Sequence, residues 1–350
     1  MLEPFLLVTT EEGGLDRYSQ ELAKRLPVRR KETRRYLNFS DRFNLIRLLS
    51  SLNALVHLPN QHFGRFAFFL KAPFLITVHD IARFKFHFVR EGLAEKLGLW
   101  LDRKGIKKAD LVIAVSEYTK RDIVEFLGVP PEKIEVIYNG IDLEVFKPRK
   151  DIPFDFPYIM CVGSERPRKN LGRLLKAFTL IKKYFPGLKL VKVGTEGRSS
   201  DFRTRTLNQI AELGLEEDVI FVGHVEDKEL SRYYSGALLL AYPSLYEGFG
   251  FPPLEAMACG CPVVASNTTS IPEIVGDAGV LFDPYEVDEI AEALRKVIED
   301  EKLRKRIIEK GLNRVKRFSW DKTADQTYNL YQKVINKIMK ESSGLLCPSS

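Results

Sequence analysis

The sequence predicts an α/β protein with two domains, each a doubly wound parallel sheet with helices on both faces. Short apolar runs alternate with helix-like segments along the chain, which is typical of βαβ units. The alternation stops in a proline-rich stretch at residues 147–157 and then starts again. At 350 residues, the chain is also longer than one ordinary α/β core. Together these observations favour two domains of the same kind.

The first half of the chain contains five apolar runs that we interpret as strands: Phe5–Thr9, Ala54–His57, Phe74–Val78, Leu111–Val115 and Ile134–Ile137. After the first run, Tyr18, Leu22 and Leu26 recur at helical spacing and predict an amphipathic helix. Ser116 is a candidate N-cap for a further helix that ends near Leu127.

Beyond the proline-rich stretch the pattern repeats, with predicted strands at Tyr158–Val162, Lys189–Val193, Val219–Val222, Ala237–Ala241 and Val263–Ala265. We place the domain boundary at this stretch, so the first domain covers residues 1–147 and the second covers 148–320. A final helix is expected over residues 321–341 and a disordered tail over 342–350. Two such domains imply a cleft between them, lined by the carboxyl ends of the strands.

The composition is that of an ordinary globular protein, with 45% hydrophobic and 29% charged residues. No apolar run approaches the roughly 18 residues needed to span a bilayer, and no basic-then-apolar leader precedes the first strand. The four cysteines form neither a zinc spacing nor the framework of a secreted protein. We therefore expect a cytoplasmic protein.

Part of the net charge of +7 lies in the basic run Arg29–Arg35. Basic surfaces attract nucleic acid, anionic lipid and phosphorylated ligands alike. For this run a solvated face is favoured over a membrane contact, and no nucleic-acid-binding motif accompanies it. We expect no nucleic-acid partner, and a peripheral contact at the inner face of the membrane stays open.

Two carboxylates stand eight positions apart in the segment Tyr246–Glu255, at Glu247 and Glu255. Gly248 and Gly250 between them let the backbone approach a ligand closely. Pro253 fits the first turn of a helix, so the segment reads as a turn that ends in a helix N-terminus. Such a turn suits a sugar held by carboxylates beside phosphates held by backbone amides.

A basic loop follows the predicted strand Tyr158–Val162 and precedes a helix. It carries three cations, Arg166, Arg168 and Lys169. Cations at a strand end suit a diphosphate, because Arg offers a planar fork and Lys a compact charge. A solvated basic loop is an equally good interpretation of this segment alone, and the glutamate pair shifts the balance toward phosphate binding.

Two further features lie at strand ends in the first domain. Gly13-Gly14 follows the first strand, where backbone amides meet anions, although a plain strand-to-helix turn is commoner. His79 follows the strand Phe74–Val78 and could contact a substrate hydroxyl, or it could be a core histidine. The chain has no G-x-G-x-x-G fingerprint of dinucleotide binding, no Asp-x-Asp motif and no metal-ligand spacing of histidines. We expect neither a metal nor a cofactor.

In their order and spacing, these stretches resemble family-4 retaining glycosyltransferases of the GT-B fold over roughly residues 5–320. The resemblance rests on Gly13-Gly14, Thr77–Asp80, Val115–Glu117, Tyr138–Asp142, Pro167–Asn170, Gly223–Val225, Glu247–Pro252 and Ile271–Glu273. The two glutamates match the E-x7-E motif, and the basic loop matches a mannosyltransferase-like subgroup with Pro-Arg-Lys-Asn. The resemblance implies two domains facing a cleft, with the acceptor mainly on the first and the nucleotide sugar on the second. It also implies a final helix that crosses back onto the first domain.

The resemblance also implies roles for residues of the second domain. Arg168 and Lys169 would hold the diphosphate of the donor. Glu247 would face the donor sugar and Glu255 the ribose hydroxyls, while Val225 would lie near the base. Many members carry an arginine where this chain has Ser164, so Lys169 is a firmer assignment than Arg168.

Backbone groups and a histidine complete the implied site. The amides of Gly248, Phe249 and Gly250 would face the donor sugar together with the neighbouring glutamate. In the first domain, Gly13 and Gly14 would close over the phosphate and sugar. His79 matches a cleft histidine that contacts the transferred sugar or the acceptor.

The predicted function is therefore retaining transfer of a hexose from a nucleotide diphosphate sugar to a hydroxyl of a saccharide or lipid-linked acceptor. The basic loop leans toward GDP-mannose, with UDP-glucose next. A sugar-nucleotide epimerase and a non-catalytic nucleotide-sugar-binding protein are the alternatives. The run Arg29–Arg35 and the aromatic residues Phe63, Phe66, Phe68 and Phe69 could serve a lipid-linked acceptor at a membrane, but a solvated edge and a buried helix are favoured.

Overall fold

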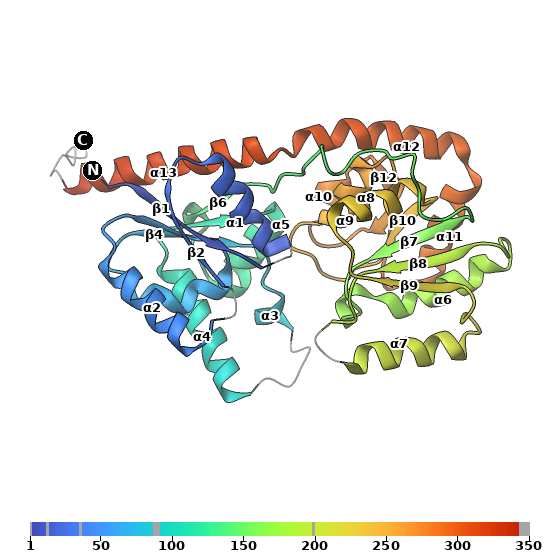
Figure 1. Cartoon of the computed structure of the whole chain (residues 1–350), viewed down its shortest axis with the longest axis horizontal. Coiled ribbons are helices and arrows are strands. Elements are labelled where there is room, and N and C mark those ends of the chain that lie inside the picture. Colours follow the sequence, from blue (N-terminus) through green and yellow to red (C-terminus); the bar gives the residue numbers. More distant parts are fainter. Residues whose placement is uncertain (1, 12–13, 35–36, 87–91, 198–199, 343–350) are drawn as a thin grey trace. The chain divides into compact units, whose positions relative to one another are not determined.

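The computed structural model describes residues 2–11, 14–34, 37–86, 92–197 and 200–342. The chain divides into two compact units, one formed by Met1–Gly140 with Trp320–Ser350 and the other by Ile141–Ser319. Each unit is built on its own sheet (Figure 1). The prediction of two doubly wound α/β domains is confirmed.

All six strands of the first sheet are parallel, in the order β2-β1-β3-β4-β5-β6. The central strands β3, β4 and β5 are buried along their whole length, because helices cover both faces of a parallel sheet. The strand order reverses between β1 and β3, and such a switch point is where open sheets bind ligands. The strands are β1 (Pro4–Thr9), β2 (Arg29–Thr33), β3 (Leu55–Leu58), β4 (Phe74–Val78), β5 (Leu111–Ala114) and β6 (Ile134–Val136).

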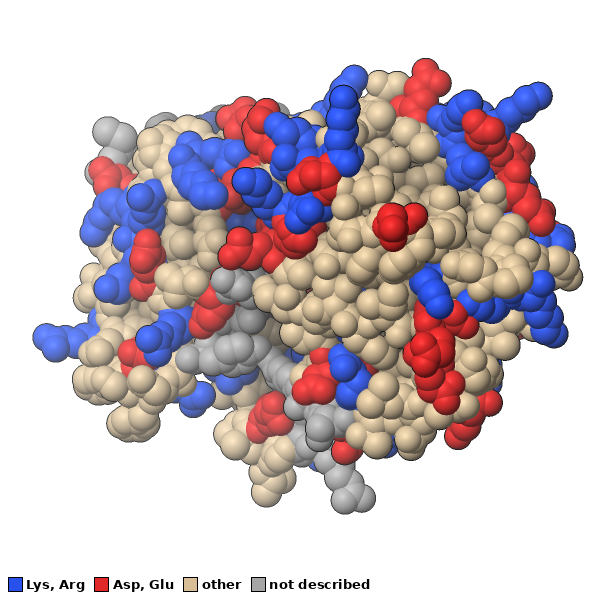
Figure 2. Space-filling view, turned by 45° about the vertical axis from the view of Figure 1, so that its right-hand side comes forward, with Lys and Arg blue, Asp and Glu red and all other residues tan. Residues whose placement is uncertain are grey.

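The basic run near the N-terminus forms the edge strand β2. Sequence patterning did not identify it as a strand, because four of its five residues are exposed and it lacks an apolar run. Exposed charges at a sheet edge discourage pairing with another chain. On the face shown in Figure 2, positive and negative side chains are interspersed over the surface.

The helices of the first unit include α1, whose apolar face packs on the sheet, and α5, which Ser116 caps by accepting the backbone N–H of Thr119 at 3.0 Å. Gly128, at φ +67°, follows the last turn. The elements are α1 (Gly14–Arg25), α2 (Phe39–Ser51), η1 (Gln61–Phe69), α3 (Ala82–Lys85), α4 (Leu93–Lys108), α5 (Glu117–Asp122), η2 (Ile123–Leu127), η3 (Pro131–Lys133) and α13 (Trp320–Ser342).

The final helix α13 belongs to the first unit. On α13, Tyr331 places its hydroxyl 2.6 Å from Nδ1 of His57, which is fully buried on β3. Thr323 donates its hydroxyl to the carbonyl of Tyr138 at 2.7 Å. Ser342 is the last residue of this helix, and residues 343–350, where a disordered tail was expected, lie outside the described part of the chain.

The division between the units falls after Gly140, whereas the prolines had suggested a boundary after residue 147. Ile141 forms an isolated parallel bridge with Ser319. Phe146 packs edge-on against Tyr234, with ring centroids 6.5 Å apart. These contacts attach the segment after Gly140 to the second unit, ahead of the proline-rich stretch.

The second sheet is also parallel, in the order β12-β11-β10-β7-β8-β9. Its strand order reverses between β7 and β10, so the loops after these two strands meet at the switch point. The edge strand β12 was not predicted, because three of its four residues are only half-buried and it opens with a glycine. The strands are β7 (Tyr158–Val162), β8 (Lys189–Val193), β9 (Val219–Gly223), β10 (Leu239–Tyr242), β11 (Val263–Ser266) and β12 (Gly279–Phe282).

Helices on both faces of the second sheet bury its core. Side chains from α6 and α11 meet those of β7, β8 and β10 in one apolar cluster. None of the helices in the described ranges is long and apolar enough to cross a bilayer. The elements are η4 (Pro167–Lys169), α6 (Leu171–Lys182), α7 (Ser200–Glu212), α8 (Asp227–Gly236), α9 (Phe251–Ala258), α10 (Ile271–Val275), α11 (Val287–Glu299), α12 (Glu301–Arg314) and η5 (Val315–Arg317).

Candidate functional site

The basic loop after β7 folds back so that the side chain of Lys169 lies against Gly163, the residue that follows the strand. The backbone turns at Gly163, where φ is +134° and a Cβ would come within 3.1 Å of Cε of Lys169. Only glycine leaves room for the lysine there. Asn170, itself at φ +58°, donates its amide to the carbonyls of Pro243 and Pro284 at 3.1 and 2.7 Å. These bonds fix the loop to the loops that follow β10 and β12.

The loop after β10 carries Glu247 and joins the basic loop through the backbone. The N–H of Leu245 donates to the carbonyl of Arg168 at 2.7 Å. Ser270 donates its hydroxyl to the carbonyls of Glu247 and Phe249, at 3.0 and 2.7 Å. Gly250 lies at φ +121°, and a Cβ added there would come within 3.0 Å of Cδ1 of Ile271. The turn into α9 therefore requires glycine.

The two loops meet in a cluster of charges around one carboxylate oxygen. Nζ of Lys169 lies 2.6 Å from Oε1 of Glu247 and donates to the hydroxyl of Tyr242 at 2.9 Å. Nη1 of Arg168 lies 3.0 Å from the same Oε1 and donates to the carbonyl of Tyr246 at 2.8 Å. Ser244 donates its hydroxyl to that oxygen at 2.5 Å. The structure therefore brings together Arg168, Lys169 and Glu247, as the sequence predicts.

This cluster has an excess of positive charge in a buried setting. Burial of the Glu247 carboxyl opposes its ionisation, but Arg168 and Lys169 outweigh this and lower its pKa to about 2. The carboxylate is thus charged at neutral pH. Burial lowers the pKa of the Lys169 ammonium from its ordinary value, against the attraction of Glu247. Two cations therefore face one carboxylate, at 3.0 and 2.6 Å from its Oε1.

The second predicted glutamate has a different environment. Glu255 is buried on α9 and accepts a hydrogen bond from the hydroxyl of Tyr234 on α8 at 3.0 Å. Its carboxylate thus has a tyrosine hydroxyl as partner where that of Glu247 has two cations.

The remaining residues of the predicted site in this unit are backbone positions or apolar. Phe249 is buried, and its ring packs edge-on against Phe251 and Phe318, at centroid distances of 5.1 and 6.0 Å. Its side chain belongs to the core, so only its backbone is available for binding. Gly248 precedes it in the turn that leads into α9. Val225 is half-buried in the loop after β9.

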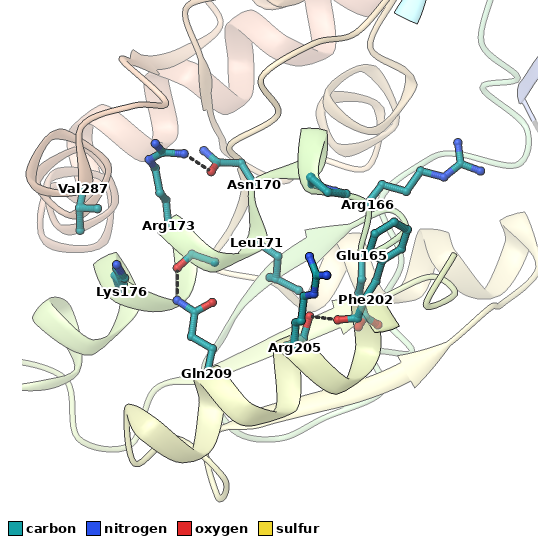
Figure 3. Close-up of a pocket in the computed structure, with 13 residues that line it drawn as sticks. Glu165, Arg166, Asn170, Leu171, Arg173, Lys176, Phe202, Arg205, Gln209 and Val287 are labelled. Carbon is teal, nitrogen blue, oxygen red and sulfur yellow. Dashed lines mark hydrogen bonds between the residues drawn. The ribbon is translucent and has the colours of Figure 1, made fainter. Parts of the chain in front are cut away.

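A cavity of about 420 Å³ opens on the other side of the basic loop, between α6 and α7 (Figure 3). Arg166, Pro167 and Asn170 of the loop line it, but Arg168, Lys169 and Glu247 do not. At its base, Glu165 is bound by Arg203 at 2.6 Å and lies 3.2 Å from Nζ of Lys192. The cavity is therefore distinct from the charge cluster.

In the first unit, His79 follows β4 and is largely buried. Its Nε2 lies 3.0 Å from the carbonyl of Pro59, and its backbone N–H donates to Oε1 of Gln61 at 3.2 Å. The ring of Tyr18 packs edge-on against it at 5.0 Å. Gly14 is the first residue of α1, while Gly13 lies outside the described residues.

Two protein-family models match consecutive parts of the chain. The model described as Glycosyltransferase Family 4 matches residues 5–145. The model described as Glycosyl transferases group 1 matches residues 142–314. The chain belongs to family 4 of the glycosyltransferases. The predicted membership of this family is thereby confirmed.

Individual relatives of this family-4 chain match it over part of their length. The O-antigen chain mannosyltransferase B of Escherichia coli is 34% identical over 243 residues, which are 65% of this chain and 62% of the relative. In Campylobacter jejuni, the N-acetylgalactosamine-N,N'-diacetylbacillosaminyl-diphospho-undecaprenol 4-alpha-N-acetylgalactosaminyltransferase is 34% identical over 222 residues, 62% of this chain and 58% of the relative. The chain thus spans about three fifths of the length of these relatives.

A solved structure of similar fold is Anabaena HepE in complex with UDP and glucose. It superimposes on this chain with a TM-score of 0.79 at 21% identity, covering 95% of this chain and 100% of HepE. The family-4 chain accordingly has the GT-B fold, with one Rossmann-like domain in each unit.

Sequence reasoning missed several residues that hold the family-4 cluster in place. Tyr242 ends a buried strand and was indistinguishable from a core residue. Ser244 is a lone serine in a loop. Thr269 lies at φ +58°, where a β-branched residue is rare, and its hydroxyl accepts the N–H of Glu247 at 3.2 Å. The only signal for Thr269 was its position just before the Ile271–Glu273 motif.

Proposed function

We propose that this chain is a retaining glycosyltransferase that moves a hexose from a nucleotide diphosphate sugar to a hydroxyl group. The observation that carries the proposal is the cluster of Arg168, Lys169 and Glu247 at the switch point of the second sheet. Its two cations have the sign and the hydrogen-bond donors that suit a diphosphate. Arg168 stands 3.0 Å from the carboxylate, which supports it as the second cation where many family members have an arginine in place of Ser164.

In this mechanism the cations act on the leaving group. Negative charge develops on the diphosphate as the glycosidic bond breaks, and fixed positive groups in a buried site stabilise that charge. The amides of Gly248, Phe249 and Gly250 face the donor sugar. A leaving phosphate oxygen takes the proton of the acceptor hydroxyl, so that the new bond forms on the face from which the diphosphate departs.

Glu247 orients the sugar and does not attack it. Its Oε1 accepts from Lys169 and Ser244 and lies beside Arg168. A carboxylate held by two cations, with a pKa of about 2, is a weak nucleophile, but it can still accept a sugar hydroxyl. Glu255 would bind the ribose and Val225 would lie near the base. In the first domain, His79 would contact the transferred sugar or the acceptor, and Gly13 and Gly14 would close over the donor. We propose no role for a metal or a cofactor.

We propose mannose or glucose as the transferred hexose. The Pro-Arg-Lys-Asn loop and the mannosyltransferase relative in Escherichia coli support GDP-mannose. The Anabaena structure that shares the fold contains UDP and glucose, which supports UDP-glucose as the second donor to test.

We propose a saccharide or lipid-linked acceptor. The name of the Campylobacter relative specifies an acceptor on diphospho-undecaprenol. An acceptor of that kind is embedded in a membrane, so the enzyme would work in peripheral contact with the bilayer surface.

The test is transfer from labelled GDP-mannose and UDP-glucose to a panel of saccharide and lipid-linked acceptors, with the anomeric configuration of the product determined by NMR. We expect Lys169→Ala and Glu247→Ala to lower turnover by about 10²–10³-fold, because each removes a group that stabilises or orients the reacting donor. Chelation of metals with EDTA should leave the rate unchanged.

The matched control is Lys182→Ala, which breaks another half-buried ion pair of the same unit, between Lys182 and Asp218, away from the cluster. It should keep full activity. Near-normal transfer by the Lys169 or Glu247 variant would contradict the assigned roles. A changed sugar nucleotide without a new glycosidic bond would identify an epimerase, and donor binding without turnover across the panel would identify a non-catalytic protein.

A further inference from the structure

Exposed apolar side chains are concentrated on three neighbouring elements of the first unit. Phe39 and Leu93 are 87% and 88% exposed, and Trp100 is 54% exposed. Such exposure of large side chains is costly in water and marks an interaction surface when the side chains form one patch. We define the aromatic face as these residues of α2, η1 and α4: Phe39, Phe43, Phe68, Phe69, Leu93, Leu97 and Trp100.

The members of the aromatic face lie on adjacent elements. A Cβ at Gly105 of α4 would come within 1.8 Å of the carbonyl oxygen of Gly64 in η1, so the two backbones are in direct contact. Lys108 of α4 donates to the carbonyl of Ala67 and lies 5.8 Å from the ring centroid of Phe68. Helix α2 also contacts η1, so η1 is in contact with both helices.

Helical spacing aligns the exposed residues of α4 in a single stripe. Leu93, Leu97 and Trp100 are four and three positions apart, so they project from the same side of the helix. The opposite side of α4 is buried and packs on η1 through Gly98, Asp102 and Gly105. The side chains of the apolar stripe therefore take no part in the packing of α4 on η1.

Cations lie on the same elements as the aromatic face. Lys96 and Lys104 flank it on α4, and Nζ of Lys104 lies 5.6 Å from the ring centroid of Trp100. The acidic residues on the same elements are fewer, and one of them, Glu95, is paired with Arg83 at 2.9 Å. Exposed cations lie on α2 and α4, and Lys71 lies just after η1. On the two helices they are Arg42, Arg47, Lys96, Arg103, Lys104, Lys107 and Lys108.

We propose that the aromatic face binds the surface of an anionic membrane, with its aromatic and leucine side chains among the lipid headgroups and its lysines on lipid phosphates. Trp and Phe interleaved with Lys and Arg are typical of surfaces that lie in the bilayer interface. A protein partner fits less well, because the cores of protein interfaces are depleted of lysine. The proposal deepens the proposed lipid-linked acceptor by naming the surface that would reach it.

This surface differs from the one that the sequence suggested. Phe63 and Phe66 are buried, as the favoured interpretation of a buried helix requires, but Phe68 and Phe69 are exposed. The run Arg29–Arg35 contributes the edge strand β2 instead. The patch could not be found in the sequence, because it joins α2, η1 and α4 across more than fifty positions.

The experiment is flotation of the full chain with vesicles of phosphatidylcholine alone and of phosphatidylcholine mixed with phosphatidylglycerol, without donor or acceptor. We expect binding to the anionic vesicles that weakens as salt is added. The triple variant Phe39→Gln/Leu97→Gln/Trp100→Gln should lose it. The triple variant Lys71→Gln/Lys96→Gln/Lys104→Gln should weaken it by roughly fivefold for each lysine removed.

Matched controls change the second unit by the same chemistry. Lys150→Gln/Lys183→Gln/Lys228→Gln removes three exposed lysines there, and Tyr184→Gln/Leu207→Gln removes two exposed apolar side chains; both should bind vesicles as wild type does. No binding to anionic vesicles, or equal loss in the controls, would overturn the proposal. Self-association in solution that the aromatic variant abolishes would instead identify a protein interface. Transfer to a water-soluble acceptor should not change in these variants. A failure of the membrane proposal can therefore be told apart from a failure of the proposed transferase activity.

Discussion

At the scale of single residues, the cluster depends on backbone conformations that most side chains avoid. Asn170 and Thr269 both lie at φ +58°. Asn170 directly follows Lys169, and Thr269 accepts the backbone N–H of Glu247. A non-glycine residue in such a conformation costs about 1–3 kcal/mol, and the cost is tolerated where surrounding contacts hold it. Strain beside the reacting groups indicates that their position matters more to the molecule than local stability.

Thr269 offers a direct test of this positioning. Thr269→Val keeps the shape of the side chain but removes the oxygen that accepts the N–H of Glu247. We expect the turnover number to fall by about tenfold, the effect of one hydrogen bond, with little change in the KM for the donor. Steady-state kinetics measure both, and Thr269→Ser serves as the control that keeps the acceptor. Equal activity of the two variants would show that the hydroxyl has no positioning role.

The charge of Glu247 makes stability depend on pH. Its pKa of about 2 lies below the ordinary value of 4.5. A depressed pKa stabilises the folded state above the ordinary pKa, and the contribution is lost as the pH falls from 4.5 through about 2. The difference corresponds to about 3 kcal/mol in the free energy of unfolding. Urea denaturation across this window should show the full loss in wild type and in an exposed-residue control, Glu212→Gln, and a loss smaller by about 3 kcal/mol in Glu247→Gln. Parallel curves for all three would refute the assignment.

At the scale of elements, close packing of α4 on η1 supports both the first unit and the aromatic face. Gly105→Ala would force a Cβ to within 1.8 Å of a carbonyl oxygen, and overpacking of this kind costs about 1–3 kcal/mol or more. We expect a lower denaturant midpoint and weaker vesicle binding. Gly92→Ala is the control, because a Cβ there meets no atom within 4 Å. Should Gly105→Ala unfold at the same midpoint as Gly92→Ala, the contact is looser than described.

Elements differ in how well the sequence predicts them. Buried parallel strands such as β4 and β7 are short apolar runs, so their positions were predicted closely. The edge strand β2 lacks such a run, since four of its five residues are exposed. The edge strand β12 has only three apolar residues after a glycine, and both strands were missed. Loop positions followed from strand ends, which is why Lys169 and Glu247 could be matched before the structure was known.

At the scale of the whole molecule, the contacts that could not be predicted are those between distant segments. The hydrogen bond from Tyr234 to Glu255 joins α8 to α9, and nothing in either helix indicates the other as its partner. The same holds for Tyr242, Ser244 and Thr269 around Glu247. Family motifs identify which residues meet a substrate, but the polar residues that hold them are ordinary types in ordinary patterns.

The return of α13 to the first unit has a consequence for synthesis on the ribosome. His57, buried on β3, finds the hydroxyl of Tyr331 only 274 positions later in the chain. Until the last helix has left the exit tunnel, Nε2 of this imidazole can contact Thr77 at 2.8 Å, but Nδ1 has no Tyr331 hydroxyl to replace water. The amino-terminal half therefore waits, incompletely assembled, while the other half is translated, and a premature stop codon near the end would damage the part of the enzyme that was made first.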